Sequence, residues 1–118
     1  MQPATTQKLM GAMLGVVDEG TGARAKQIVD GTGWDLGGKT GTADVRPGQR
    51  PDAWFAGLMI GPDARPKYTV VVYVENGGQG GQRAAPIAGA MTRFMAGWTK
   101  ERAAAATPPR TALREGGR

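Results

Sequence analysis

One short segment, DGTGWDLGGKTGTADV, combines residues that could bind an anionic group in two different ways. Gly33, four further residues, and then Gly38, Lys39 and Thr40 satisfy the pattern G-x-x-x-x-G-K-[ST], in which backbone amides and a lysine cradle nucleotide phosphates. The same Lys39 and Thr40, followed by Gly41, form a K-T-G tripeptide that places a cation and a hydroxyl beside an unobstructed backbone. The first arrangement would bind a nucleotide, and the second would bind the carboxylate end of a peptide.

The residues around Lys39 argue against the phosphate-binding pattern. That pattern requires a helix that begins at its lysine, so that the helix N-terminus faces the phosphates. Gly41 disfavours a helix by about 1 kcal/mol relative to alanine, Pro47 would break it, and the segment has no helical apolar period. Trp34 would also be bulky within a phosphate-binding loop. We therefore expect a strand over residues 35–43 and no bound nucleotide.

On such a strand, the K-T-G residues form a candidate substrate-binding site made of Lys39, Thr40, Gly41 and Thr42. Side chains alternate along a strand, so Thr40 and Thr42 share one face, and Lys39 must reach a common ligand around the strand edge. Gly41 carries no side chain, which lets an extended ligand pair with the backbone. A cation and two hydroxyls beside an open strand edge suit a terminal peptide carboxylate.

Three residue types are absent from the whole sequence, which contains no Cys, no His and no Ser. Without Cys and His, we expect no metal site, and no motif indicates a cofactor. Without Ser and Cys, the chain has no nucleophile for acyl transfer of the serine or thiol type.

The charge distribution indicates a basic tail rather than a nucleic-acid surface. The net charge is +5, and residues 100–118 contain five basic and two acidic side chains. We interpret this tail as solvated and expect no nucleic-acid partner. No apolar run approaches the ~18–20 residues that span a bilayer, and no signal-peptide pattern opens the chain.

The elements that position the K-T-G residues can be read from apolar spacing. Helical spacing predicts a helix over residues 5–19, and β-branched or apolar runs predict strands over 35–43, 53–61 and 68–75. Residues 26–33 are ambiguous. A second helix is predicted over 84–98, with an apolar stripe that we expect to pack on the sheet. This stripe consists of Ile87, Met91, Phe94, Met95 and Trp98.

These elements predict an α+β fold with a three-stranded antiparallel sheet and two helices packed on one of its faces. We expect one domain over residues 1–102 and a disordered basic tail over 103–118, where Pro108 and Pro109 end any helix.

The order of the motifs resembles a known family. EGTGARA precedes GGKTGTA, and DAWFAGL and then YTVVVYVENGGQGGQRAAPIAGAM follow it. Over about residues 1–98, this order and spacing resemble the C-terminal part of the transpeptidase domain of penicillin-binding proteins. The likeness is closer to the monofunctional, class B D,D-transpeptidases than to the bifunctional enzymes.

The resemblance implies a role for each K-T-G residue. Enzymes of this family acylate a serine with a D-alanyl-D-alanine stem peptide and pass the acyl group to a neighbouring peptide, which cross-links peptidoglycan on the outer face of the cell membrane. β-Lactams trap the same serine. By resemblance, Lys39 and Thr40 help to bind the carboxylate of the stem peptide or antibiotic. The backbone N–H of Thr42 would be a catalytic oxyanion-hole donor, and its hydroxyl a further substrate contact.

The chain departs from the family in its other motifs. The family's nucleophile lies in S-x-x-K and further catalytic groups in S-x-N, and neither exists in a chain without Ser. Thr5 and Lys8 have T-x-x-K spacing, which we interpret as a helix cap followed by an exposed lysine. We therefore expect a C-terminal fragment that is inactive alone. The family's sheet has five strands, so the strand over 68–75 would have an open apolar edge here.

Two alternatives remain open. One is a non-catalytic module that binds a peptide or a partner protein through its exposed edge. The other is a remnant of a serine β-lactamase, which shares the K-T-G strand.

Overall fold

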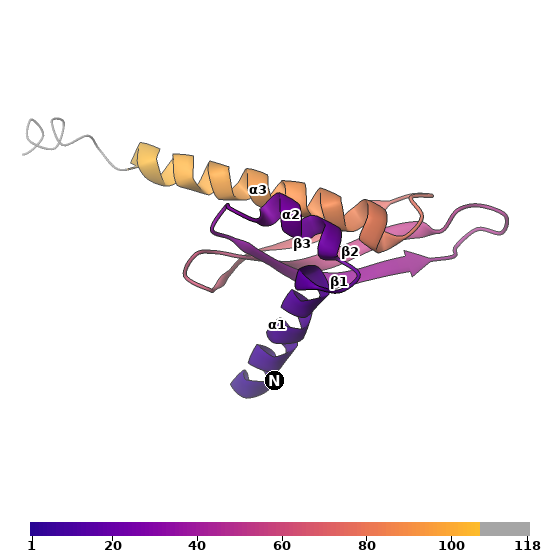
Figure 1. Cartoon of the computed structure of the whole chain (residues 1–118), viewed down its shortest axis with the longest axis horizontal. Helices are drawn as coiled ribbons and strands as arrows, with labels where there is room; N and C mark the ends of the chain where they lie inside the picture. Colours follow the sequence, from indigo (N-terminus) through magenta and orange to yellow (C-terminus); the bar gives the residue numbers. More distant parts are fainter. Residues whose placement is uncertain (107–118) are drawn as a thin grey trace, which may run out of the picture.

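The computed structural model describes residues 1–106 of the 118-residue chain. Its helices and strands follow one another in this order: α1 (Pro3–Asp18), α2 (Ala23–Val29), β1 (Asp35–Ala43), β2 (Asp52–Ile60), β3 (Pro66–Val74) and α3 (Gly80–Ala106). Figure 1 shows α3 running along the sheet while α1 projects away from it. One antiparallel sheet with helices confirms the predicted α+β class.

The sheet has three strands in the order β1–β2–β3, with β2 in the centre. Thr40 on β1 lies opposite Phe55 on β2, and Phe55 lies opposite Val72 on β3. The predicted strand over 35–43 has the observed bounds, and the other two predictions differ from the observed bounds by one or two residues. The connections are too short for a crossover, so consecutive strands pair antiparallel.

The core lies between one face of the sheet and α3. Phe55, Ala84 and Ala88 are fully buried there, and Leu36 and Val72 are nearly so. These residues come from all three strands and from α3, so the sheet and the C-terminal helix stabilise each other by burying apolar surface.

The apolar stripe predicted to pack α3 on the sheet is largely exposed, which corrects that prediction. Met95 alone among its members packs partly against the core. The exposed members are Ile87, Met91, Phe94 and Trp98, whose exposed fractions are 43%, 43%, 68% and 38%. The buried residues of α3 are instead small: Gly80, Ala84, Ala85, Ala88, Gly89, Thr92 and Ala96.

Close approach explains why the small face of α3 is the buried one. A Cβ atom on Gly80 would lie 2.4 Å from the carbonyl oxygen of Gly41 on β1. A Cβ atom on Gly89 would lie 3.0 Å from the carbonyl oxygen of Ala25 on α2. Backbone atoms cannot give way as a flexible side chain can, so large residues do not fit between α3, the sheet and α2.

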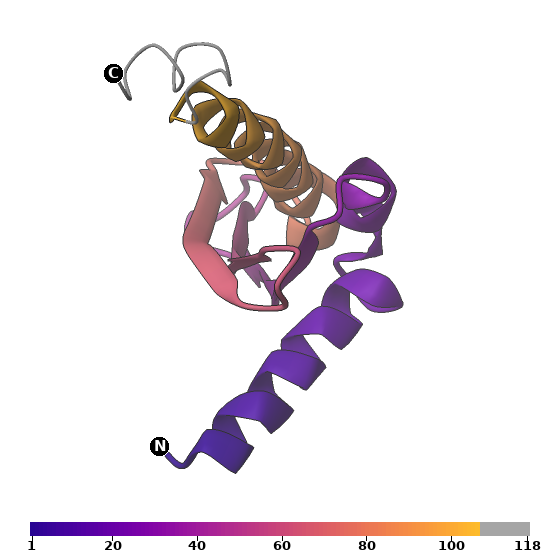
Figure 2. The ribbon, with the colours of Figure 1, turned by 90° about the vertical axis from the view of Figure 1, so that its left-hand side faces the viewer.

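The arrangement of the helices differs from the expectation in two details. A third helix, α2, begins at Ala23 and includes the first part of the ambiguous segment 26–33, and it packs beside α3. In addition, α1 lies on the other side of the sheet from α3, as Figure 2 shows. A Cβ atom on Gly37 would meet Met13 and Leu14 of α1, whereas one on Gly38 would meet Phe55 in the core. Because adjacent residues of a strand face opposite sides, α1 and α3 approach opposite faces.

The predicted tail over 103–118 falls mostly outside the described residues. α3 continues to Ala106, so residues 103–106 are helical rather than disordered. The rest of that prediction, residues 107–118, lies beyond the part of the chain that the structure describes.

Candidate functional site

Lys39 lies in the middle of β1, and no helix begins there. Its side chain is exposed, and its Nζ donates a hydrogen bond to the carbonyl oxygen of Thr40 at 2.7 Å. A phosphate-binding loop requires a helix N-terminus at the lysine. The phosphate-loop interpretation is therefore excluded by the backbone around Lys39, and the predicted strand is confirmed.

Thr40 and Thr42 lie on the face of β1 opposite to Lys39, and both side chains connect β1 to neighbouring segments. The Thr40 hydroxyl, in a side chain that is nearly buried, lies 2.6 Å from the hydroxyl of Thr21 in the turn between α1 and α2. The Thr42 hydroxyl accepts a hydrogen bond from the backbone N–H of Gly80 at 3.2 Å. These two contacts join the K-T-G strand to the start of α2 and to the start of α3.

A side chain at Gly41 would be crowded by the neighbouring strand β2. A Cβ atom at this position would lie 3.3 Å from the Cβ atom of Trp54 on β2, which is a tight contact. The Gly41 carbonyl oxygen also lies where a Cβ atom on Gly80 would project. Glycine at position 80 therefore allows the N-terminus of α3 to lie directly on β1 and β2, and glycine at position 41 avoids a tight contact with Trp54.

A cavity of about 530 Å³ opens on the threonine side of β1. Polar side chains from four segments line it: the α1–α2 turn, α2, β1 and the segment around the start of α3. They are Thr21, Arg24, Thr40, Thr42, Gln79 and Gln82. Lys39 does not line this cavity. The predicted site residues therefore do not lie together in the structure. Thr40 and Thr42 line the cavity, whereas Lys39 lies on the other face of the strand.

Sequence reasoning missed the contributions of Thr21, Arg24, Gln79 and Gln82. The motifs EGTGARA and VENGGQGGQ carry part of the family resemblance, but no site residue was predicted in them, and their glycines are the signal that could have been used. Gly81 and Gly22, for example, lie where a Cβ atom would come within 2.0 Å and 3.2 Å of another segment's backbone. Glycines that permit close approach often mark the places where distant segments meet.

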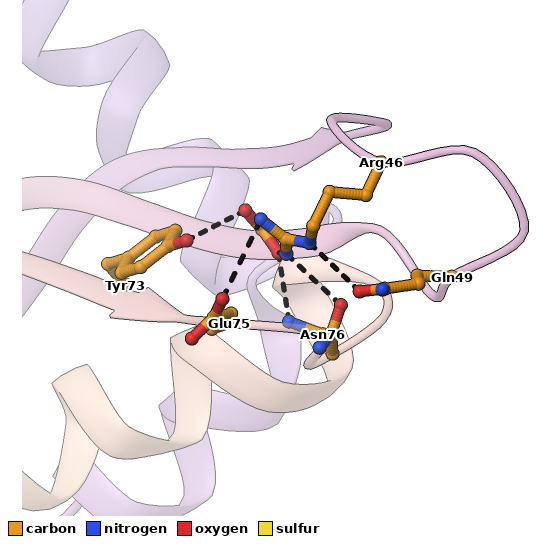
Figure 3. Close-up of polar contacts among 6 residues, drawn as sticks. Arg46, Gln49, Tyr73, Glu75 and Asn76 are labelled. Atoms are coloured by element: carbon orange, nitrogen blue, oxygen red, sulfur yellow. Dashed lines mark hydrogen bonds and ion pairs between the residues drawn. The ribbon is translucent and has the colours of Figure 1, made fainter.

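A second polar cluster lies at the loop that connects β1 to β2, as Figure 3 shows. Its centre is Asp52, which is only 2% exposed at the start of β2. Asp52 accepts hydrogen bonds from the Tyr73 hydroxyl at 2.7 Å, from the backbone N–H of Asn76 at 2.9 Å, and from the Arg46 guanidinium. Arg46 also donates to Gln49 at 2.9 Å.

This cluster stabilises the charged form of Asp52. The backbone N–H of Asn76, then the Tyr73 hydroxyl and the Arg46 guanidinium, hold the pKa of Asp52 below its ordinary value. The hydrogen bond to Asp52 raises the pKa of Tyr73. The backbone N–H of Gly78 bonds the Pro51 carbonyl oxygen at 2.9 Å nearby. Together these bonds fix the β1–β2 connection to the segment that leads into α3 and the cavity wall.

Two comparisons with known proteins indicate the same kind of domain. The family model described as penicillin binding protein transpeptidase domain matches residues 1–93. Among solved structures, the chain is similar to the D,D-transpeptidase domain of a peptidoglycan glycosyltransferase from Eggerthella lenta, with 28% sequence identity and a TM-score of 0.58. That match covers 83% of this chain and 21% of the other, so the chain spans about a fifth of that domain structure. A search of curated proteins finds no match.

The family match extends over most of the chain, from α1 to the middle of α3, and includes the K-T-G strand and the cavity beside it. The solved structure has the same fold over a similar share of the chain. The chain therefore belongs to the family of penicillin-binding protein transpeptidase domains.

Proposed function

We propose that this chain carries the substrate- and β-lactam-binding strand of a peptidoglycan D,D-transpeptidase but lacks its nucleophile. The observation that carries the proposal is the position of the K-T-G residues. They lie on an edge strand of the described sheet, with the hydroxyl side of Thr40 and Thr42 facing a polar cavity. An open strand edge beside hydrogen-bond donors suits an extended peptide that ends in a carboxylate.

Within this proposal each residue has a distinct task. Thr40 and Thr42 bind the substrate through their hydroxyls, and Gly41 leaves the backbone open to a peptide. Lys39 contributes positive charge at the rim of the strand. The backbone N–H of Thr42 donates to the oxyanion that forms during acyl transfer, and losing one such donor generally costs about 3–4 kcal/mol of transition-state stabilisation.

The acylated serine would have to come from outside this chain, which contains no Ser. The ligands are then a peptidoglycan stem peptide or a β-lactam, bound once the remainder of a transpeptidase domain is present. Cell-wall cross-linking takes place outside the cytoplasm, and we place the function there on the basis of the family. Over residues 1–106, no helix is long and apolar enough to cross a membrane.

The second candidate function is a non-catalytic module that binds a peptide or partner protein through an exposed edge. The free edge of β3 and the exposed Val71 and Tyr73 favour this candidate. A β-lactamase remnant would carry the same K-T-G strand, but the family match is to transpeptidases. The class B assignment stays a prediction.

A domain chimera tests the proposal directly. Residues 1–98 would replace the corresponding segment of the Eggerthella lenta transpeptidase domain, and fluorescent penicillin would report acylation of that domain's serine. We expect labelling that falls by one to two orders of magnitude in Lys39→Ala, because the acylating serine loses the positive charge at the rim of the strand, a loss comparable to that of a charge-assisted contact worth ~1.5–3 kcal/mol.

Lys8→Ala is the matched control, because Lys8 is an exposed lysine on α1. We expect fluorescent penicillin to label the chimera with Lys8→Ala as strongly as the unmodified chimera. A folded chimera that is labelled equally well with and without the Lys39 amine would contradict the proposed role of this strand. A chimera that folds but is never labelled would favour the non-catalytic module.

A further inference from the structure

The cavity beside β1 contains more hydrogen-bond donors than its own acceptors use. The Thr42 hydroxyl already accepts the N–H of Gly80, so its proton remains available to a ligand. Thr21 and Thr40 share one hydrogen bond between two hydroxyls, which leaves one further proton free. The cavity lining includes no carboxylate. A ligand with acceptor groups therefore suits the unused hydroxyl protons of this cavity.

Arg24 supplies the positive charge on this side of the strand. It lines the cavity together with Thr40 and Thr42, and its guanidinium forms no hydrogen bond or ion pair with another of the residues 1–106. A guanidinium group offers five N–H donors in a planar arrangement and accepts none, which matches the two oxygens of a carboxylate. Lys39, in contrast, lies on the opposite face and donates to the Thr40 carbonyl.

The backbone that carries Arg24 is held firmly in position. Arg24 stands in the first turn of α2, and the next residue, Ala25, is fully buried against α3. The backbone N–H of Gly22 bonds the Val16 carbonyl oxygen at 2.8 Å, which fixes the preceding turn. Thr21 in that turn contacts Thr40. The backbone of Arg24 thus belongs to the same packed unit as the threonine hydroxyls.

We propose that Arg24, acting with the hydroxyls of Thr40 and Thr42, binds the terminal carboxylate of a peptide in this cavity. The proposal rests on the proposed function, because it specifies which cation of the chain meets the substrate carboxylate. It differs from the motif-based expectation, in which Lys39 has that role.

The probe is N-acetyl-D-alanyl-D-alanine, and the control ligand is the same dipeptide with a C-terminal amide. Each would be titrated at millimolar concentrations into the ¹⁵N-labelled chain, with amide chemical shifts as the readout. We expect saturable shifts at Thr21, Thr40 and Thr42 with the carboxylate and none with the amide. The spectrum of each variant also shows whether it is folded.

Three substitutions separate the possible cations. Arg24→Gln should raise the dissociation constant about tenfold, as expected for the loss of one charge-assisted hydrogen bond. Arg83→Gln is the matched control, because Arg83 is an exposed arginine in the first turns of α3 that does not line the cavity. Its dissociation constant should stay unchanged.

The third variant, Lys39→Gln, distinguishes this inference from the proposed function. Binding that is weakened by Lys39→Gln but not by Arg24→Gln would overturn the role of Arg24 and leave the proposed function standing. Equal binding of the acid and the amide, or no saturable shift at the threonines, would also overturn the inference. An equal response to inorganic phosphate would show a general anion site and overturn its assignment to peptide carboxylates.

Discussion

The hydroxyl oxygens of Thr21 and Thr40 lie 2.6 Å apart, although the two residues belong to different elements. This hydrogen bond connects the turn before α2 to the K-T-G strand, and both residues line the cavity. The two residues are separated in sequence by α2, by residues 30–34 and by the first half of β1, and they meet because the chain folds back after α2 to form β1.

Replacing Thr40 by valine tests the stabilising role of this bond. Valine keeps the shape of threonine and removes the hydroxyl, so we expect a loss of ~0.5–1.5 kcal/mol in the free energy of unfolding. Urea denaturation measures this change in the free energy of unfolding. Thr69→Val on the exposed face of β3 is the control and should change little.

Gly80 should tolerate no side chain. Gly80→Ala would place a Cβ atom 2.4 Å from the Gly41 carbonyl oxygen, and overpacking of this kind generally costs ~1–3 kcal/mol. Gly97→Ala lies on the same helix with open space around it, so it should stabilise the chain by ~0.5–1 kcal/mol. Thermal unfolding would contradict the close contact if both variants shifted the melting temperature in the same direction.

The acid sensitivity of the chain should depend on Asp52. Its pKa is held below the ordinary value of 3.8, so the folded state binds fewer protons at this carboxyl group than the unfolded state does. The resulting stabilisation is fully present above the unfolded pKa and is lost as the pH falls through the folded pKa.

Asp52→Asn cannot titrate, so its free energy of unfolding should fall less steeply between neutral and acidic pH. Tyr73→Phe removes one of the hydrogen bonds to Asp52 and should give an intermediate slope. Urea denaturation at a series of pH values measures all three proteins. Parallel pH profiles for the wild type and Asp52→Asn would show that Asp52 is not the group concerned.

The chain should form no covalent adduct with β-lactams, because it has no Ser and no Cys to acylate. Intact-mass spectrometry after incubation with penicillin measures this. A stoichiometric mass increase that survives denaturation would disprove the expectation.

The chain should also associate with itself through the β3 side of the molecule. β3 has a free edge, and α3 carries the exposed apolar residues Ile87, Met91, Phe94 and Trp98. Unpaired strand edges and exposed apolar patches both favour association. Light scattering should show a mass above that of the monomer.

Phe94→Glu places a charge in the middle of the stripe and should shift the chain toward the monomer. Leu9→Glu on α1, which is also an exposed apolar residue, is the control and should not. A monodisperse monomer at high concentration for the wild type would refute the prediction.

The sequence alone determined the strands and the face of each K-T-G residue. Alternation along a strand is a local property, so it separates Lys39 from Thr40 and Thr42 wherever the strand lies, and turn residues mark the strand ends. The absence of Ser was likewise decisive for chemistry without any structure.

Tertiary structure decided which surfaces meet. The spacing of Ile87, Met91 and Phe94 shows that they share one side of α3, but it cannot show whether that side meets the sheet. The answer depends on how closely the helix must approach β1 and α2, and this distance admits only small residues, which are glycine, alanine and Thr92. Arg24 reaches the cavity for the same reason. Contacts between segments distant in sequence arise from packing, and packing depends on the shapes of all partners at once.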